Sequence, residues 1–286
     1  MDVKKALADA LSFMEEAGIL AVENQNKAAC QIKADDTLVT ETDLAITEMA
    51  YEHFGDWFKQ PNHILIDEES IDKIGTPEQI FANSDFQWLL DPIDGTMPYA
   101  NGRPSYGIFL AIVHKGFPVL SVIYQPAQDL LIYGTSGKGV VKVKNPFTPQ
   151  AEMIPIEKYQ LKEFTSQSMF DISRSYLIQG GWRKIFYGNT QECTLQGGVR
   201  LVQGQSSGLL TSDKCSIWDV VPIWCLVKML GGGEVYNFST KEIINQIDAS
   251  WFQEDWKVRS GWLFAPEKAL DIMHDYLNEV MNEEAA

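Results

Sequence analysis

The sequence of 286 residues contains few cysteines and few histidines, four of each. No two cysteines are spaced as C-x-x-C, and no group of histidines and cysteines has the spacing of zinc ligands. We therefore expect neither a disulfide framework nor a structural zinc site. We interpret the cysteines as free thiols in a reducing compartment, and the scattered histidines as structural or surface residues: Cys30, Cys193, Cys215 and Cys225; His53, His63, His114 and His274.

Basic residues are also scarce. The chain has 23 lysines and arginines against 39 acidic residues, which gives a formal net charge of −16 at pH 7. An acidic surface repels nucleic acids and anionic membranes, so we expect neither as a partner. The chain also lacks an apolar run long enough to span a bilayer, and its N-terminal segment lacks the continuous apolar core of a signal peptide. We therefore expect a soluble, cytoplasmic protein.

The hydrophobic pattern of the first half predicts both helices and strands. Apolar residues recur at helical spacing over residues 2–24, and a second helix is expected over 42–58 after a capping-like start. Two short apolar runs that each end in an acid predict buried strands at 63–67 and 87–91. The polar stretch 71–85 between them is expected to be a loop. Three β-rich runs separated by turn residues predict an antiparallel meander over 106–133.

In the second half, the pattern alternates between strands and helices. Strands are expected at 173–179 and 207–211, and helices at 194–204, 216–230 and 266–282. The helix 216–230 ends at three consecutive glycines, which are a strong stop signal. This order indicates an α/β or α+β protein with mixed sheets and helix layers, with two subdomains that divide near residue 150.

Acidic residues stand at places where a predicted strand ends or a predicted helix begins, and these are the places where α/β enzymes build their sites. They are Asp43, Glu68, Glu69, Asp91, Asp94 and Asp219. Asp91 and Asp94 directly follow an apolar strand, and Gly95 allows a tight turn after them. Asp-Pro and Asp-Gly are also common turn dipeptides, so an ordinary loop remains an alternative for this segment. Asp219 has an alternative role too, because the segment from Ser216 fits a capping box at a helix N-terminus.

If these acids converge, their carboxylates would repel one another unless bound cations compensated the charge. Carboxylate oxygens favour Mg²⁺ over Zn²⁺. Bound cations would also reverse the local field, which otherwise repels a phosphorylated metabolite. If the acids converge, the pattern therefore predicts a magnesium site.

The string from Trp88 to Thr96, WLLDPIDGT, resembles the signature W-x-x-D-P-I-D-G-T of the inositol monophosphatase family. This family belongs to a superfamily of lithium-sensitive, Mg²⁺-dependent phosphatases. The wider family pattern is also present in order: Asp43, Glu68-Glu69, Trp218-Asp219 and, after eleven further residues, Gly231-Gly232.

The resemblance implies a layered αβαβα sandwich that forms one compact catalytic unit. Residues 1–150 would form an N-terminal α+β subdomain with most of the metal ligands, and residues 151–286 an α/β subdomain with Asp219. The family pattern assigns a first Mg²⁺ to Glu68, Asp91 and the carbonyl of Ile93. It assigns a second ion to Asp91, Asp94 and Asp219, and a third to Glu68 with a water, which makes two or three ions in all.

The same resemblance assigns catalytic roles. Glu68 and Thr96, with Asp43 behind Thr96, would orient and activate the attacking water. The backbone N–H groups of Gly95 and Thr96 would receive the phosphate. Lys33 lies near the position of a family lysine, although its spacing is one residue shorter.

The chain departs from the family pattern where the alcohol half of the substrate is held. Asp67 stands where the family usually has glycine, and it either adds charge beside the metal or turns away. The aligned substrate-binding residues are Asp94, Thr194, Leu195, Ser212 and Asp213. Leu195 is bulkier than the family's alanine, and Ser212 replaces a hydroxyl-binding acid, unless the adjacent Asp213 substitutes for it.

The expected substrate is therefore inositol monophosphate or a similar polyol phosphate. The alternatives are histidinol phosphate, fructose 1,6-bisphosphate and a 3′-phosphoadenosine nucleotide. A regulatory protein on the same fold is the non-enzymatic alternative. The resemblance also implies inhibition by Li⁺ and a homodimer.

Overall fold

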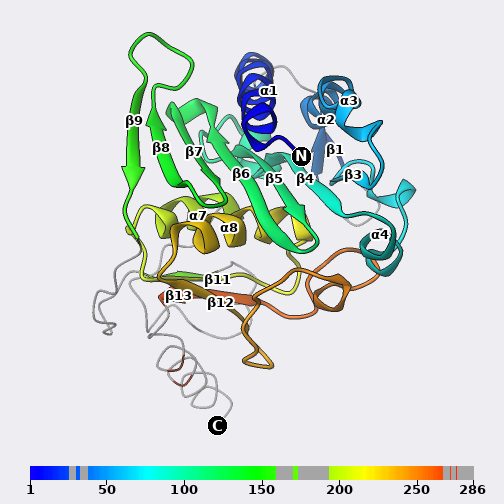
Figure 1. The fold of residues 1–286 in the computed structure, drawn as a ribbon. Coiled ribbons are helices and arrows are strands. Elements are labelled where there is room, and N and C mark those ends of the chain that lie inside the picture. Colours follow the sequence, from blue (N-terminus) through cyan, green and yellow to red (C-terminus); the bar gives the residue numbers. More distant parts are fainter. Residues whose placement is uncertain are drawn as a thin grey trace.

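The computed structural model describes residues 1–25, 30–32, 38–158, 170–172 and 193–266, together with Asp271 and Asp275. This part of the chain forms alternating layers of helices and sheets (Figure 1). Helices α1 (Val3–Asn24) and α2 (Glu41–His53) cover one face of a seven-stranded sheet. Helices α7 (Thr194–Val202) and α8 (Ile217–Leu230) lie between its other face and a four-stranded sheet. The fold is thus the expected mixed α/β sandwich, with four of the five predicted layers among the described residues.

The seven-stranded sheet follows chain order. It consists of β3 (His63–Asp67), β4 (Phe86–Asp94), β5 (Gly107–His114), β6 (Phe117–Gln125), β7 (Leu130–Thr135), β8 (Gly139–Lys144) and β9 (Glu152–Ile156). The pair β3–β4 is parallel and the other neighbours are antiparallel, so the sheet is mixed. The predicted meander over 106–133 is therefore confirmed. It continues into β8 and β9.

The four-stranded sheet has the order β10 (Phe170–Ile172), β11 (Gly208–Leu210), β13 (Trp262–Pro266) and β12 (Gly233–Asn237), and only β10–β11 is parallel. Helix α8 is apolar around most of its circumference because both sheets bury it. Arg200 of α7 forms a two-pronged ion pair with Asp171 of β10, whose side chain is fully buried. This pair fixes α7 to the smaller sheet.

Smaller elements connect these layers. They are the hairpin β1 (Cys30–Ile32) and β2 (Leu38–Thr40), the short helices α3 (Gly55–Phe58), α4 (Pro77–Asn83) and α5 (Thr96–Ala100), and the 3₁₀ turns η1 (Ile71–Lys73), η2 (Pro126–Gln128) and η4 (Ala249–Trp251). In the part of the chain that the structure describes, no helix has the length and apolar character needed to cross a membrane.

The predicted strands 63–67, 87–91 and 207–211 and the helices 2–24, 194–204 and 216–230 are confirmed in kind, with small shifts at their ends. The expectation of a loop over 71–85 is wrong, because η1 and α4 lie there and Thr76 begins α4 with a capping box to Gln79. The predicted helix 42–58 is divided at Phe54 into α2 and α3. The predicted strand 173–179 and Lys33 lie outside the described residues, as does most of 266–282, and Pro266 is the last residue of β13. The division near residue 150 stays a prediction.

Two hydrophobic clusters pack against opposite faces of the seven-stranded sheet. Leu89 of β4 belongs to the cluster shared with α7 and α8, whereas Trp88 and Leu90 belong to the cluster shared with α1 and α2. Because β4 is buried on both faces, its sequence is apolar until it reaches its acidic end. This packing places that acidic end beside the first turn of α8.

Candidate metal site

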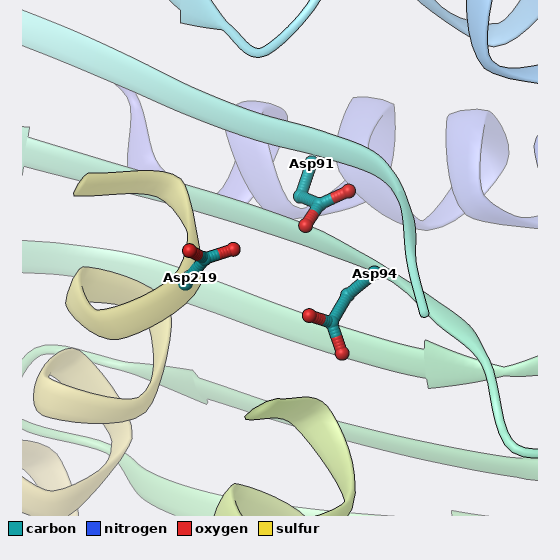
Figure 2. Close-up of side chains that lie close together, drawn as sticks. All are labelled: Asp91, Asp94 and Asp219. Atoms are coloured by element: carbon teal, nitrogen blue, oxygen red, sulfur yellow. The ribbon is translucent and has the colours of Figure 1, made fainter. Parts of the chain in front are cut away.

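A β-bulge near the end of β4 determines where its two acids point. Residues Asp91 and Asp94 pair with Phe109 and Gly107 of β5, so three steps along β4 match two steps along β5. In a regular strand, residues three apart face opposite sides of the sheet. The extra residue restores the parity and turns both carboxylates to the same side, as Figure 2 shows. Pro92, which has no N–H for the ladder, lies within the bulge.

Asp219 reaches the same place from the first turn of α8. Its Oδ2 accepts a hydrogen bond of 2.6 Å from the N–H of Ser216, which completes the predicted capping box. The capping alternative is therefore correct for Asp219, and it does not exclude a second role. The cap fixes the carboxylate at the helix terminus, where it points toward Asp91 and Asp94 (Figure 2).

One oxygen of each of Asp91, Asp94 and Asp219 lies within 4.8 Å of the others. Three ionised carboxylates at such separations repel one another by about 3 kcal/mol per pair at an effective dielectric constant near 20. The negative charge of Asp94 is partly compensated, because its Oδ2 accepts a hydrogen bond of 2.8 Å from the N–H of Leu195 at the start of α7. The Oδ1 atom of Asp91 is buried and has no hydrogen-bond partner among the described residues.

Burial and mutual repulsion change the acidity of these groups. Burial, then the charges of Glu68, Asp94 and Asp219, raises the pKa of Asp91 well above its ordinary range. Burial raises the pKa of Asp94 to about 6, although hydrogen bonds from Cys193 and Leu195 counteract it. Burial and the charge of Asp94 likewise raise the pKa of Asp219. At neutral pH the cluster therefore favours a compensating positive charge.

The three acids line a cavity of about 1160 Å³. Predicted site residues on its wall are Glu68, Asp91, Ile93, Asp94, Gly95, Thr96, Thr194 and Asp219. Gly95 adopts φ +90°, and a Cβ there would lie 2.8 Å from the carbonyl oxygen of Ser105, so only glycine fits. The hydroxyl of Thr96 donates to the carbonyl oxygen of Ile93 at 3.1 Å.

The residues fit a hard divalent cation. Buried carboxylate oxygens converge, one of them has no hydrogen-bond donor, and the cavity gives access from outside. An all-oxygen ligand set of this kind suits Mg²⁺. Glu68 and the carbonyl of Ile93 line the same cavity and could complete the ligand set.

Asp43 lies at the start of α2, outside the lining of this cavity. Thr40 donates to its Oδ2 from both the backbone N–H, at 2.8 Å, and the hydroxyl. Its Oδ1 is buried and has no hydrogen-bond partner in the described part of the chain. Burial raises the pKa of Asp43 to about 6 despite the bonds from Thr40, and the charge of Glu68 acts in the same direction. The role of Asp43 behind Thr96 stays a prediction.

Several residues expected near the metal or the alcohol do not line the cavity. Asp67 is buried and turns away, since its carboxylate accepts from the Tyr51 hydroxyl at 3.0 Å and the Glu69 N–H at 3.0 Å. The side chain of Leu195 is directed at Gly107 under the sheet. Ser212 is buried and Asp213 is exposed, and neither belongs to the cavity wall.

The cavity is also lined by residues that were not among the predicted site residues. Cys193, Lys214 and Trp218 line the cavity, as do residues 254–257. Cys193 and Lys214 are neighbours in sequence of the aligned residues Thr194 and Asp213, so a one-residue shift would have found them. Nothing in the sequence pattern singled out 254–257.

Comparisons with known proteins identify the family of this chain. A sequence model of the inositol monophosphatase family matches residues 3–267, so the chain belongs to that family. The members of the family are phosphatases that depend on Mg²⁺.

Among individual relatives, fructose-1,6-bisphosphatase/inositol-1-monophosphatase from Thermotoga maritima is 32% identical over 252 residues, which cover 86% of this chain and 83% of that protein. Inositol monophosphatase 1 from Solanum lycopersicum is 31% identical over 124 residues, covering 43% of this chain and 44% of that protein. A histidinol-phosphatase from Chlorobaculum parvum is 32% identical over 139 residues, 48% of this chain and 50% of that protein. The matched stretch is thus less than half of the tomato enzyme.

Solved structures show the same fold. An IMPase from Thermotoga maritima superposes with a TM-score of 0.74 at 19% identity and covers 98% of this chain and 99% of its own. A staphylococcal IMPase-I complexed with products gives a TM-score of 0.75 at 17% identity, with coverage of 97% and 96%.

Proposed function

We propose that this chain is a Mg²⁺-dependent phosphomonoesterase that hydrolyses a small phosphorylated polyol, inositol monophosphate foremost. The observation that carries the proposal is the convergence of three carboxylates on the wall of a large cavity, two of them buried on β4 and the third half-buried on α8. A buried cluster of this kind destabilises the fold unless a cation compensates it. Family membership supports the reaction class, and the long match to the Thermotoga maritima fructose-1,6-bisphosphatase/inositol-1-monophosphatase supports a small phosphorylated polyol as substrate.

Asp91, Asp94 and Asp219 would hold magnesium, with Glu68 and the Ile93 carbonyl as further ligands, in two or three ion sites. Bound Mg²⁺ supplies a water of lowered pKa and neutralises the phosphate oxygens and the leaving alkoxide. Glu68 and Thr96 orient the attacking water, with Asp43 behind Thr96. The N–H groups of Gly95 and Thr96 receive the phosphate at the start of α5.

At the alcohol end, the aligned residues divide into two groups. Thr194 lines the cavity, so it would contact the alcohol directly. Leu195, Ser212 and Asp213 would act indirectly, because they do not line the cavity. Leu195 also supports Asp94 through its backbone N–H.

Histidinol phosphate is the second candidate, since a histidinol-phosphatase is among the similar proteins. Fructose 1,6-bisphosphate and a 3′-phosphoadenosine nucleotide complete a panel of four substrates. Release of phosphate from each, with Mg²⁺ and with EDTA, separates the candidates. Turnover of none of them above the rate for a generic aryl phosphate would refute the specific proposal.

The non-enzymatic alternative is a regulatory protein on the same fold. It gains support if EDTA leaves the thermal stability unchanged and Mg²⁺ supports no hydrolysis. Inhibition by Li⁺, a homodimer and a cytoplasmic location belong to the same proposal, and they rest on the family resemblance.

A further inference from the structure

A turn far along the chain forms part of the cavity wall. Residues 254–257 line the cavity together with the loop that follows β3, which contributes Glu68, Glu69, Asp72 and Gly75. The turn is closed by a hydrogen bond of 2.8 Å from the N–H of Gln253 to the carbonyl of Lys257. None of these turn residues has a role in the proposed reaction.

The backbone of this turn is attached to the first turn of α8. The N–H of Ile217 donates to the carbonyl oxygen of Trp256 at 3.1 Å, and the N–H of Val258 donates to Cys215 at 2.9 Å. Ser216 and Lys257 form an antiparallel bridge between these two bonds. The turn is therefore fixed to the segment that holds the Asp219 carboxylate.

The side chain of Trp256 extends from the turn to the part of the cavity wall formed by the loop after β3. Its indole N–H donates to the carbonyl oxygen of Gly75 at 3.0 Å, and only 1% of the residue is exposed. The ring also packs near Phe81 of α4, with 6.4 Å between ring centroids. Trp256 adopts φ +67°, which is an outlier for a bulky residue, so its surroundings hold it in an unfavourable backbone conformation.

The two walls carry different parts of the acidic site. Glu68 follows β3 in the seven-stranded sheet, whereas Asp219 lies in the first turn of α8. The body of α8 packs on β4, β5 and β6, and Trp256 joins the two walls directly through its hydrogen bond to Gly75.

We propose that Trp256 is a positioning residue: its indole N–H holds the loop after β3 at a fixed separation from the first turn of α8, and thereby sets the affinity of the acidic site for a divalent cation. Ligands held rigidly by surrounding contacts bind a metal more tightly than ligands that must first be ordered. The inference rests on the proposed function only in that the site binds Mg²⁺.

The test is calorimetric titration of Mg²⁺ into protein freed of metal, with turnover measured in parallel. Trp256→Phe keeps a ring and removes the N–H donor, and Trp256→Tyr keeps more of the ring volume without a donor at that position. Both variants should bind Mg²⁺ about three- to tenfold more weakly, the range expected for one lost hydrogen bond that orders a site. Turnover at saturating Mg²⁺ should stay near that of the wild type, because the acids themselves are retained.

Trp251→Phe is the matched control. Trp251 lies in the same segment and its indole N–H also donates to a backbone carbonyl, that of Gln246 at 2.9 Å, but it does not line the cavity. This variant loses the same kind of bond and should keep the wild-type affinity for Mg²⁺.

Unchanged affinity in either folded Trp256 variant would overturn the inference, as would an equal loss in Trp251→Phe. If circular dichroism shows both Trp256 variants to be unfolded, Trp256 serves stability alone and the positioning role is also refuted. A wild-type protein that binds no Mg²⁺ is a different result, because it refutes the proposed function itself.

Discussion

Replacing Asp94 by asparagine should stabilise the metal-free protein while it removes the proposed activity. Asp94 is 7% exposed and burial raises its pKa to about 6 from 3.8. At pH 7.5 its ionisation in the metal-free fold therefore costs about 3 kcal/mol, at about 1.4 kcal/mol per pKa unit. An asparagine oxygen can still accept the bond from the Leu195 N–H, so little is lost in return.

The expected result is a rise of about 4–6 °C in the unfolding midpoint of Asp94→Asn in EDTA, at about 2 °C per kcal/mol for a chain of this size. The increase in stability on adding magnesium should instead be larger for the wild type than for the variant. Magnesium stabilises the wild type by about 2.7 kcal/mol at a concentration a hundredfold above its Kd, and it should stabilise the variant far less because one charged ligand is gone. Turnover of the variant should be almost abolished.

Differential scanning fluorimetry with and without Mg²⁺ measures both effects. Asp56→Asn is the matched control, since that carboxylate is 87% exposed on the surface and the variant loses the same charge. A lower midpoint for Asp94→Asn in EDTA would refute the electrostatic reasoning, and an undiminished response to Mg²⁺ or near wild-type turnover would refute the role of Asp94 in the metal site.

Three further predictions concern other parts of the site and the fold. Because burial raises the pKa of Asp43 and Asp94 to about 6, their protons stabilise the metal-free fold fully below about pH 4 and this stabilisation disappears as the pH rises through 6. The midpoint shift on adding Mg²⁺ should thus be larger at pH 8 than at pH 5, and equal shifts would contradict this. Gly95→Ala should lower the free energy of unfolding in urea by about 1–3 kcal/mol and abolish turnover, since φ is +90° and the new Cβ would meet the carbonyl of Ser105. Gly137→Ala, at φ +74° with nothing within 4 Å, should cost only the backbone strain and is its control. Arg200→Ala should cost about 3–5 kcal/mol by leaving Asp171 buried without its partner, whereas replacing both by apolar residues should recover most of the loss.

Much of the fold was predictable because its elements have strong local signals. The helix 216–230 has a cap at Ser216 and a glycine stop, and the meander has turn residues between apolar runs. The loop predicted for 71–85 failed for a local reason as well, since the capping box at Thr76 was not recognised in a polar stretch. The break at Phe54 depends on tertiary packing, because its ring is buried against Phe13 and Trp88.

The acids of the site were predictable as residues, but their geometry was not. The bulge that aligns Asp91 with Asp94 depends on the register with β5, which lies later in the chain. The direction of Leu195 depends on how α7 packs under the sheet, and this decides that Thr194 and not Leu195 faces the cavity. Trp256 had no signal at all, because its positive φ and its bond to Gly75 exist only in the folded chain.

The position of Asp219 also has a consequence for biosynthesis. Asp91 and Asp94 leave the ribosome well before the segment that will form α8, so a growing chain holds two of the three acids and lacks the third. On the proposed function, such an intermediate would offer magnesium an incomplete set of ligands, and tight binding of the ion would wait until α8 docks on the sheet. Magnesium would then be a selective ligand of the finished protein: it would draw the last docking step toward completion without stabilising partly synthesised chains.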